Sequence, residues 1–200
     1  MDKKSIDKNL PNKLTISRIV LIPVIMAVLW LPLFTDADMT VCELISAGIF
    51  FVCAVTDFID GRLARKYNIV TDFGKFMDPL ADKFLVIGAL LAATLVYENF
   101  RFCLILALSI IIFRELAVSS MRLVAKNADN VVIPAALPGK IKTFSQCVFV
   151  MLLLLEPYIF AFSDFIVKYR IFTFAFYVIM LFFTVYSGIL YFLTYKKYIF

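Results

Sequence analysis

Six long apolar stretches constrain this 200-residue chain more than any other feature of its sequence. They cover approximately residues 14–34, 40–60, 79–97, 102–121, 143–162 and 171–194. A helix needs roughly 20 mostly apolar residues to cross the hydrocarbon core of a bilayer, and each stretch meets that requirement. Hydrophobic residues make up 63% of the chain and charged residues 18%, which leaves no room for a separate soluble domain. We therefore expect an all-α, polytopic membrane protein with six transmembrane helices, forming a single domain over residues 1–200.

Basic residues are distributed unevenly between the two sets of connecting loops. Clusters of lysine and arginine precede the first span and follow the second, fourth and sixth, whereas the opposite loops contain few of them. The positive-inside rule then places both termini and every basic cluster in the cytoplasm. The first apolar stretch lacks a small-x-small cleavage site after it, so we expect a retained helix rather than a signal peptide. Residues 1–13 fit either a short interfacial helix or a disordered tail.

The composition also excludes several kinds of chemistry. Histidine is absent, which rules out imidazole catalysis and most zinc or haem sites in this chain. The four cysteines form no CxxC pair and lie in or beside apolar stretches, so we interpret them as small buried hydrophobic residues. We expect membrane lipids, and not nucleic acid, as partners. Prolines and a glycine interrupt residues 127–140, which predicts a loop between the fourth and fifth spans.

Aspartates gather where the second span ends and the third begins. On a helix that continues from the second span, Asp57, Asp60, Gly61, Ala64 and Arg65 share one face. Gly74, Asp78 and Asp82 share a face if the third helix starts early, but Pro79 disfavours a helical residue before it, and we expect that helix to begin close to Asp78. In either case two carboxylates from each helix can point into one gap.

The energetic cost of these carboxylates calls for compensation. A charged aspartate costs roughly 2.5–3.5 kcal/mol at the centre of a bilayer and less near its surface, and four together would repel one another. Protonation, ion pairing with nearby lysine or arginine, or bound divalent cations could each offset this cost. Oxygen ligands without histidine or cysteine suit hard ions such as Mg²⁺ or Mn²⁺. The small residues on the same faces fit either close helix packing or the floor of a site for a phosphorylated ligand. Asp72 lies apart from this pattern and fits a loop or helix cap.

The pattern from Asp57 to Asp82 resembles the signature of the CDP-alcohol phosphotransferases at all eight defined positions. The resemblance extends over the whole chain, because that family has six membrane helices with the signature on the second and third. It implies two divalent cations held by the four aspartates, which bind the pyrophosphate of a CDP-linked lipid. It also implies that Asp82 is the general base and that the protein is a homodimer. The remaining signature residues would then contact the CDP-lipid: Gly61, Ala64, Arg65 and Gly74.

Three further stretches, 10–23, 113–125 and 137–146, resemble the bacterial phosphatidylglycerophosphate synthases within that family. This resemblance implies transfer of the phosphatidyl group from CDP-diacylglycerol to the 1-hydroxyl of glycerol 3-phosphate, giving phosphatidylglycerol phosphate and CMP. It also implies a bacterial plasma membrane location with the site facing the cytoplasm. Inositol phosphate and phosphatidylglycerol are the alternative acceptors. A divalent-cation transporter is a remote alternative, because the acids crowd at one end of the spans.

The acceptor phosphate would need cationic partners on the cytoplasmic side. Arg114 and Arg122 lie two turns apart on the fourth helix, and Lys140 and Lys142 open the fifth, whose dipole would add anion affinity. Contact with anionic lipid headgroups is the other explanation for these bases. Glu115 could orient Arg114, while Thr143 and Gln146 could add hydrogen bonds. Arg18, one turn inside the first helix, would serve the acceptor or a phosphate, or only mark the membrane boundary.

Overall fold

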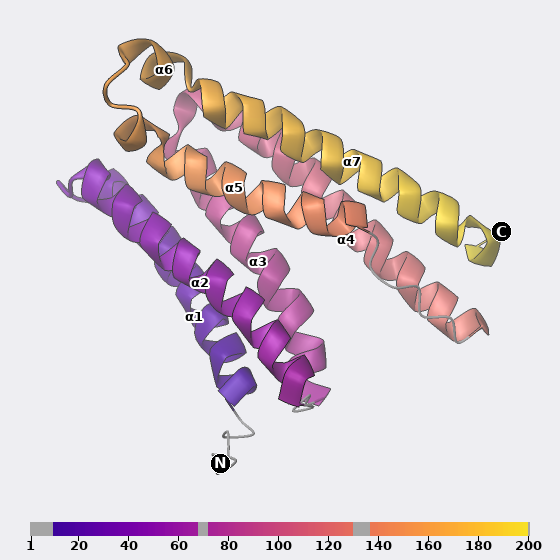
Figure 1. Cartoon of the computed structure of the whole chain (residues 1–200). Coiled ribbons are helices and arrows are strands. Elements are labelled where there is room, and N and C mark those ends of the chain that lie inside the picture. The colour runs from indigo at the N-terminus through magenta and orange to yellow at the C-terminus, as the bar shows by residue number, and fades with distance from the viewer. Residues whose placement is uncertain (1–9, 68–71, 130–136, 200) are drawn as a thin grey trace. The chain divides into compact units, whose positions relative to one another are not determined.

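The computed structural model describes residues 10–67, 72–129 and 137–199, with side chains described for 14–57, 77–125 and 137–196. All secondary structure in these ranges is helical (Figure 1). The elements are α1 (Leu10–Phe34), α2 (Met39–Tyr67), α3 (Asp72–Val96), the 3₁₀ turn η1 (Glu98–Phe100), α4 (Arg101–Asp129), α5 (Leu137–Ile159), α6 (Asp164–Tyr169) and α7 (Ile171–Ile199).

Six segments within the described ranges are long and apolar enough to cross a membrane, which confirms the expected all-α fold with six spans. They are Leu14–Phe34, Met39–Asp57, Met77–Val96, Glu98–Ala125, Leu137–Ile159 and Asp164–Lys196. Many large apolar side chains on these helices are exposed, including Phe102 at 79% and Phe113 at 76%. Such surfaces are unfavourable in water and suit contact with lipid.

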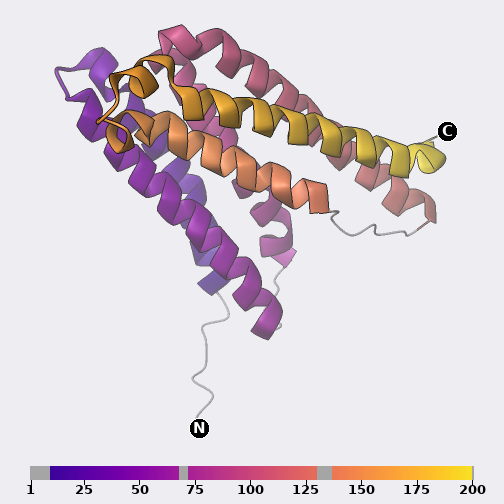
Figure 2. The same ribbon diagram turned by 45° about the horizontal axis from the view of Figure 1, so that its top comes forward.

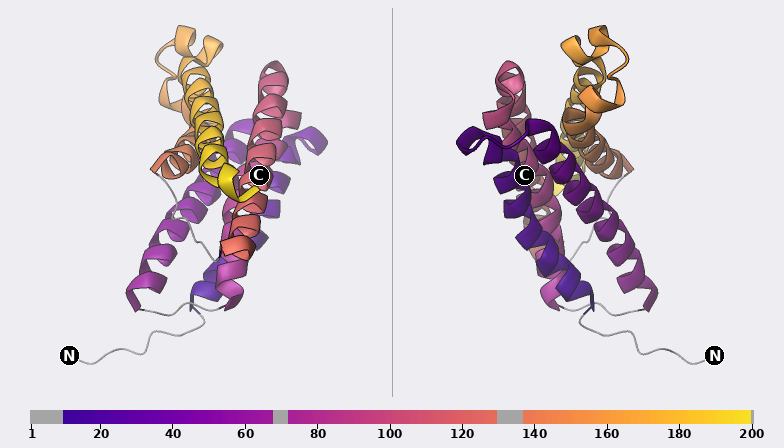
Figure 3. Two further views of the ribbon diagram at one scale, coloured as in Figure 1. Left: turned by 90° about the vertical axis from the view of Figure 1, so that its right-hand side faces the viewer. Right: turned by 90° about the vertical axis from the view of Figure 1, so that its left-hand side faces the viewer.

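The chain divides into two compact units, of which the first covers Met1–Ala92. Within it α1 packs along α2, and the starts of α1 and α3 lie at the same end as the end of α2 (Figure 3). Helices α1 and α3 approach closely at Gly88, where an added Cβ would lie only 2.6 Å from Cγ2 of Ile22. Near the opposite end, the indole nitrogen of Trp30 donates to the carbonyl oxygen of Ala92 at 3.0 Å. The close packing fixes the depth of α1 against the helix that carries Asp78 and Asp82.

The second unit covers Ala93–Phe200, and in it α7 packs along both α4 and α5 (Figure 2). Arg170, with φ of 49°, adopts the left-handed conformation that turns the chain from α6 into α7. The fully buried carboxylate of Glu156 on α5 accepts hydrogen bonds from the backbone N–H groups of Phe172, at 2.9 Å, and Thr173, at 2.7 Å. Because the first N–H groups of a helix lack intrahelical acceptors, Glu156 caps α7 and ties it to α5.

Some expected helix boundaries were wrong. Helix α3 begins at Asp72 and not near Asp78, so Asp72 is helical and Pro79 lies inside the helix. Membrane helices tolerate an internal proline because neighbouring groups can satisfy the backbone that it frees. The loop expected over 127–140 is helical at both of its ends, since α4 continues to Asp129 and α5 starts at Leu137. Of the segment 1–13, considered above as an interfacial helix or a tail, residues 1–9 lie outside the described residues, and residues 10–13 belong to α1.

Candidate active site

The guanidinium of Arg18 joins the two helices that carry the signature aspartates. Its Nη1 atom donates to Oδ1 of Asp57 on α2 and, at 2.9 Å, to Oδ1 of Asp82 on α3. The Arg18 side chain is only 2% exposed, whereas the two carboxylates are 37% and 40% exposed. Because both carboxylates contact one nitrogen atom, they lie close together, and each retains a surface that another ligand can reach. This contact offsets the cost of a buried arginine in a membrane helix.

Asp78 is held by a neutral group on the same face of α1. The hydroxyl of Thr15, a residue that is 2% exposed, donates to Oδ1 of Asp78 at 2.5 Å. Thr15 and Arg18 are three residues apart on α1, and Asp78 and Asp82 are four apart on α3, so two successive turns of each helix face one another. Thr15 was not among the site residues predicted from the sequence. Its spacing from Arg18 at the start of a span is the signal that could have found it.

The other signature residues lie where only the backbone is described. Asp60, Gly61, Ala64 and Arg65 are in the last turns of α2, and Gly74 is in the first turn of α3. Among the side chains that the structure describes, no three carboxylates or thiols lie together as ligands of one ion. The described donors nevertheless fit Mg²⁺ or Mn²⁺, because they are partly exposed carboxylate oxygens from two helices that already converge on a cation.

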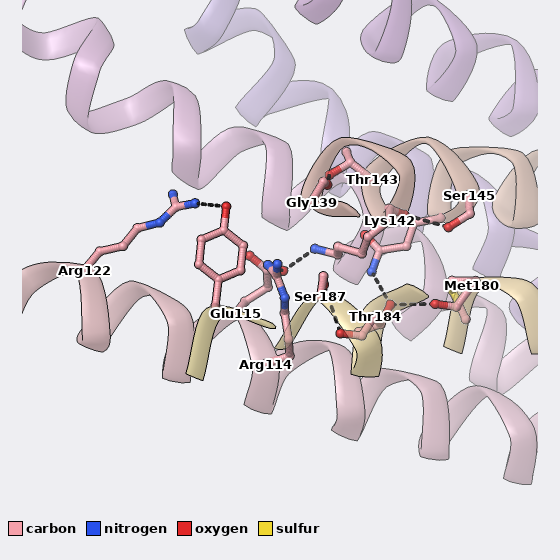
Figure 4. A network of polar contacts seen from close by, with 12 residues as sticks. Arg114, Glu115, Arg122, Gly139, Lys142, Thr143, Ser145, Met180, Thr184 and Ser187 are labelled. Carbon is pink, nitrogen blue, oxygen red and sulfur yellow. Dashed lines mark hydrogen bonds and ion pairs between the residues drawn. The ribbon is translucent and has the colours of Figure 1, made fainter. Parts of the chain in front are cut away.

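A second charged cluster occupies the second unit, where the middle of α4 faces the start of α5 (Figure 4). Glu115 accepts hydrogen bonds through Oε1 from Nη1 of Arg114, at 2.8 Å, and from Nζ of Lys142. All three side chains are almost buried, with exposed fractions of 11%, 10% and 6%. The carboxylate thus holds two cations from different helices. Glu115 does orient Arg114, as its position beside that arginine suggested, and Lys142 is directed toward Glu115.

Tyr191 on α7 adds an aromatic ring to this cluster. Nη2 of Arg122 donates to its hydroxyl at 2.8 Å. The guanidinium carbons of Arg122 and Arg114 lie 4.9 Å and 5.4 Å from the ring centroid, within cation–π range. Among the described side chains, the cluster therefore contains three cations and one carboxylate, an excess of two positive charges. Tyr191 was not predicted from the sequence, because a single tyrosine in an apolar stretch gives no indication of what it contacts.

Three other residues near the start of α5 have different surroundings. Lys140 is exposed in the first turn of the helix. Thr143 is exposed as well, and its hydroxyl donates to the carbonyl oxygen of Gly139 at 3.2 Å. Gln146 is buried and its amide donates to the hydroxyl of Thr184 on α7 at 3.5 Å. These hydrogen bonds of Thr143 and Gln146 are thus made to residues of α5 and α7. Lys140, by contrast, is exposed and could contact a ligand.

The fold and these clusters define a polytopic, all-helical membrane protein with clusters of charged side chains on its spans. The family model described as CDP-alcohol phosphatidyltransferase matches residues 8–195, nearly the entire chain. The chain belongs to this family, whose members are transferases.

Curated relatives agree with this family assignment. A protein of Bacillus subtilis named CDP-diacylglycerol–glycerol-3-phosphate 3-phosphatidyltransferase is 42% identical over 154 residues, which cover 74% of this chain and 77% of the relative. A protein of the same name from Rickettsia felis is 40% identical over 152 residues, covering 75% and 77%. Another, from Salmonella choleraesuis, is 38% identical over 150 residues, covering 74% and 78%.

Proposed function

We propose that this chain transfers the phosphatidyl group of CDP-diacylglycerol to the 1-hydroxyl of glycerol 3-phosphate, releasing CMP. Family membership supports the reaction class, and the names of relatives about 40% identical support this donor and acceptor. The single observation that supports a phosphorylated acceptor is the charged cluster of the second unit. Its excess of two positive charges complements a phosphate dianion, which phosphatidylglycerol as an acceptor lacks.

The donor side of the proposal uses the signature residues. Asp57, Asp60, Asp78 and Asp82 would hold two divalent cations, Mg²⁺ or Mn²⁺, which when bound neutralise the pyrophosphate and make CMP a better leaving group. Gly61, Ala64 and Gly74 would give the CDP-lipid access to the helix backbone, and Arg65 would contact its phosphates. The acyl chains stay in the bilayer while the headgroup reaches the polar ends of the spans.

Asp82 is the base in this proposal. Its carboxylate accepts the proton of the 1-hydroxyl as that oxygen attacks the β-phosphorus in line, and the bond from phosphorus to the CMP oxygen breaks with its electron pair leaving on CMP. No covalent enzyme intermediate is needed. The hydrogen bond from Arg18 fixes the direction of the Asp82 carboxylate. The Asp82 side chain is 40% exposed, which leaves room for the incoming hydroxyl.

On the acceptor side, Arg114, Arg122 and Lys140 would donate to the phosphate. Lys142 would support them through Glu115, the carboxylate that also holds Arg114. Arg18 would act on the acceptor only through the aspartates that it contacts. The proposal also includes a cytoplasmic site, a bacterial plasma membrane location and a homodimer. Cysteine accessibility in intact cells and cross-linking in membranes test these last points.

The deciding experiment measures CMP release by the detergent-purified protein with CDP-diacylglycerol and Mg²⁺. Glycerol 3-phosphate, inositol phosphate and phosphatidylglycerol are compared as acceptors. We expect turnover with glycerol 3-phosphate alone, its loss in Asp82→Asn, and its retention in Asp36→Asn, a matched change of an exposed loop aspartate. Turnover with another acceptor would keep the family reaction and reject the acceptor, while no turnover with any of them would reject the proposal.

A further inference from the structure

The environment of Tyr191 suggests more than packing. Tyr191 is 4% exposed, yet its hydroxyl accepts a hydrogen bond from Arg122, a residue whose side chain is otherwise exposed. Figure 4 shows Arg122 reaching along the cluster toward Arg114 and Glu115 from the next turns of α4. A long arginine side chain at an exposed position normally samples many rotamers, so contact with both the ring and its hydroxyl restricts Arg122 strongly.

The register of α4 against α7 creates this arrangement. Arg114, Val118 and Arg122 recur every four residues on α4, and Gly188 and Tyr191 lie three residues apart on α7, so one face of each helix meets the other. A Cβ added at Gly188 would lie 3.3 Å from Cγ of Arg114. Because glycine has no Cβ, the aliphatic part of the arginine side chain can pack against α7 at this point. Tyr195 stacks on Tyr191 with centroids 6.1 Å apart and ring planes at 16°, which fixes the ring.

Two observations indicate that an anion belongs beside these arginines. The Arg114 side chain is nine-tenths buried, yet its Nε makes no hydrogen bond with any residue that the structure describes. A Cβ added at Gly139 would lie 3.6 Å from the Tyr191 hydroxyl and 4.0 Å from Nη2 of Arg114. The first turn of α5, whose N–H groups lack intrahelical acceptors, therefore lies against the same two groups.

We propose that Tyr191 is a positioning residue that holds Arg114 and Arg122 at the separation needed to bind the phosphate of the acceptor. The proposal rests on the proposed function, since it assumes a phosphorylated acceptor. The ring attracts both guanidinium groups, and the hydroxyl fixes the direction of Arg122. Tyr191 itself does not contact the reacting atoms. Its effect is to order the two arginines before the acceptor arrives, so the binding step loses less conformational entropy.

Two substitutions separate the contributions of the ring and the hydroxyl. Tyr191→Phe keeps the ring and removes the acceptor for Arg122, and we expect KM for glycerol 3-phosphate to rise about fivefold to tenfold. Tyr191→Leu removes both contacts, so the rise should be larger. Neither change should alter kcat or KM for CDP-diacylglycerol by more than about twofold. Tyr186→Phe, on an exposed face of the same helix, is the control and should change none of the three constants.

A second measurement tests phosphate recognition directly. Inorganic phosphate, used as a competitive inhibitor against glycerol 3-phosphate, should lose inhibitory strength in Tyr191→Phe by about the factor that KM rises. Equal constants in wild type and Tyr191→Phe would overturn the proposal. A parallel loss of kcat and of affinity for both substrates would also overturn it, because that is the signature of a general packing defect.

The same assays separate this inference from the proposed function. If the wild type used inositol phosphate and not glycerol 3-phosphate, the proposed acceptor would be wrong. A rise in KM for inositol phosphate in Tyr191→Phe would then still support the role of Tyr191. If the wild type used only an acceptor without a phosphate monoester, both proposals would be overturned together.

Discussion

The buried carboxylate of Glu115 offers the sharpest test of how this protein stabilises charge within its spans. The change Glu115→Gln keeps the size of the side chain and removes its charge. Arg114 and Lys142, which are 10% and 6% exposed, would then lie against a neutral amide. Since lysine and arginine buried at membrane depth are costly without an opposite charge, we expect the folded protein to lose stability.

The magnitude follows from the burial of these groups. Removing one partner of a buried ion pair costs about 3–5 kcal/mol, because the remaining charge loses its compensation. The amide oxygen of glutamine can still accept one hydrogen bond, so we place the loss of unfolding free energy near the lower limit, about 3 kcal/mol. A protein of this size loses roughly 2–4 °C in Tm for each kcal/mol, so the melting temperature should fall by about 6–12 °C.

The assay is thermal unfolding in one detergent, followed by the loss of monodisperse protein on size exclusion after heating. Glu98→Gln is the matched control, because Glu98 also pairs with an arginine, Arg101 at 3.1 Å, but the two side chains are 80% and 44% exposed. Exposed pairs of this kind contribute about 0–1 kcal/mol, so the control should lower Tm by no more than a few degrees.

A comparison with a double substitution distinguishes lost charge compensation from lost packing. Lys142→Met removes one of the two cations, and in the Glu115→Gln background it should restore part of the lost Tm, because one fewer charge is left without a carboxylate. If Glu115→Gln were no more damaging than Glu98→Gln, or if Lys142→Met made the double variant still less stable, the electrostatic account of this cluster would be refuted.

Three further predictions concern other parts of the protein. Glu156→Gln should lower the unfolding free energy by about 1–3 kcal/mol and leave both KM values unchanged, because it weakens the cap of α7; thermal unfolding and steady-state kinetics check this. Gly88→Ala should cost about 1–3 kcal/mol, since its Cβ would meet the stiff side chain of Ile22, whereas Gly48→Ala, with open space around it, should cost nothing measurable by unfolding in detergent. Treatment with EDTA should abolish CMP release, and added Mg²⁺ or Mn²⁺ should restore it; activity that survives chelation would contradict the role of the aspartates.

The number of spans could be predicted from the sequence because bilayer thickness fixes the length of an apolar helix. Helix ends could not, since backbone hydrogen bonding continues past the hydrocarbon core. Helix α2 thus extends ten residues beyond the span that ends at Asp57, through the basic segment up to Tyr67. The predicted start of α3, close to Asp78, was wrong for a related reason. Pro79 disfavours a helix before it, yet the backbone from Asp72 onward is helical in spite of that local preference.

The candidate site was predictable to the extent that its chemistry is local in the sequence. Spacing alone put Asp57 and Asp82 on helix faces that can meet, but it did not say that Arg18, from a third helix, would join them. In the second unit the sequence suggested Arg114 and Arg122, whereas their contact with Tyr191 depends on the register of α4 against α7. That register results from packing between residues about 70 positions apart in the sequence. One example is Gly188, which has no side chain and so leaves space for the aliphatic part of Arg114. A one-dimensional pattern does not contain such information.

The two clusters carry charge imbalances of opposite sign, and this contrast argues for their function. Among the described side chains around Arg18, the carboxylates of Asp57 and Asp82 share one guanidinium, and Asp78 accepts a hydrogen bond from the hydroxyl of Thr15. In the second unit, Arg114 and Lys142 share the carboxylate of Glu115, and Arg122 contacts the neighbouring Tyr191, so the described side chains there include three cations and one carboxylate. Stability alone would favour balanced pairs, because charge without compensation is costly where water is scarce. The first cluster is suited to gain cations and the second to gain an anion. A reaction that joins a metal-bound pyrophosphate to a phosphorylated alcohol requires both, and either cluster without its ligand should then be a source of instability that substrate or metal binding relieves.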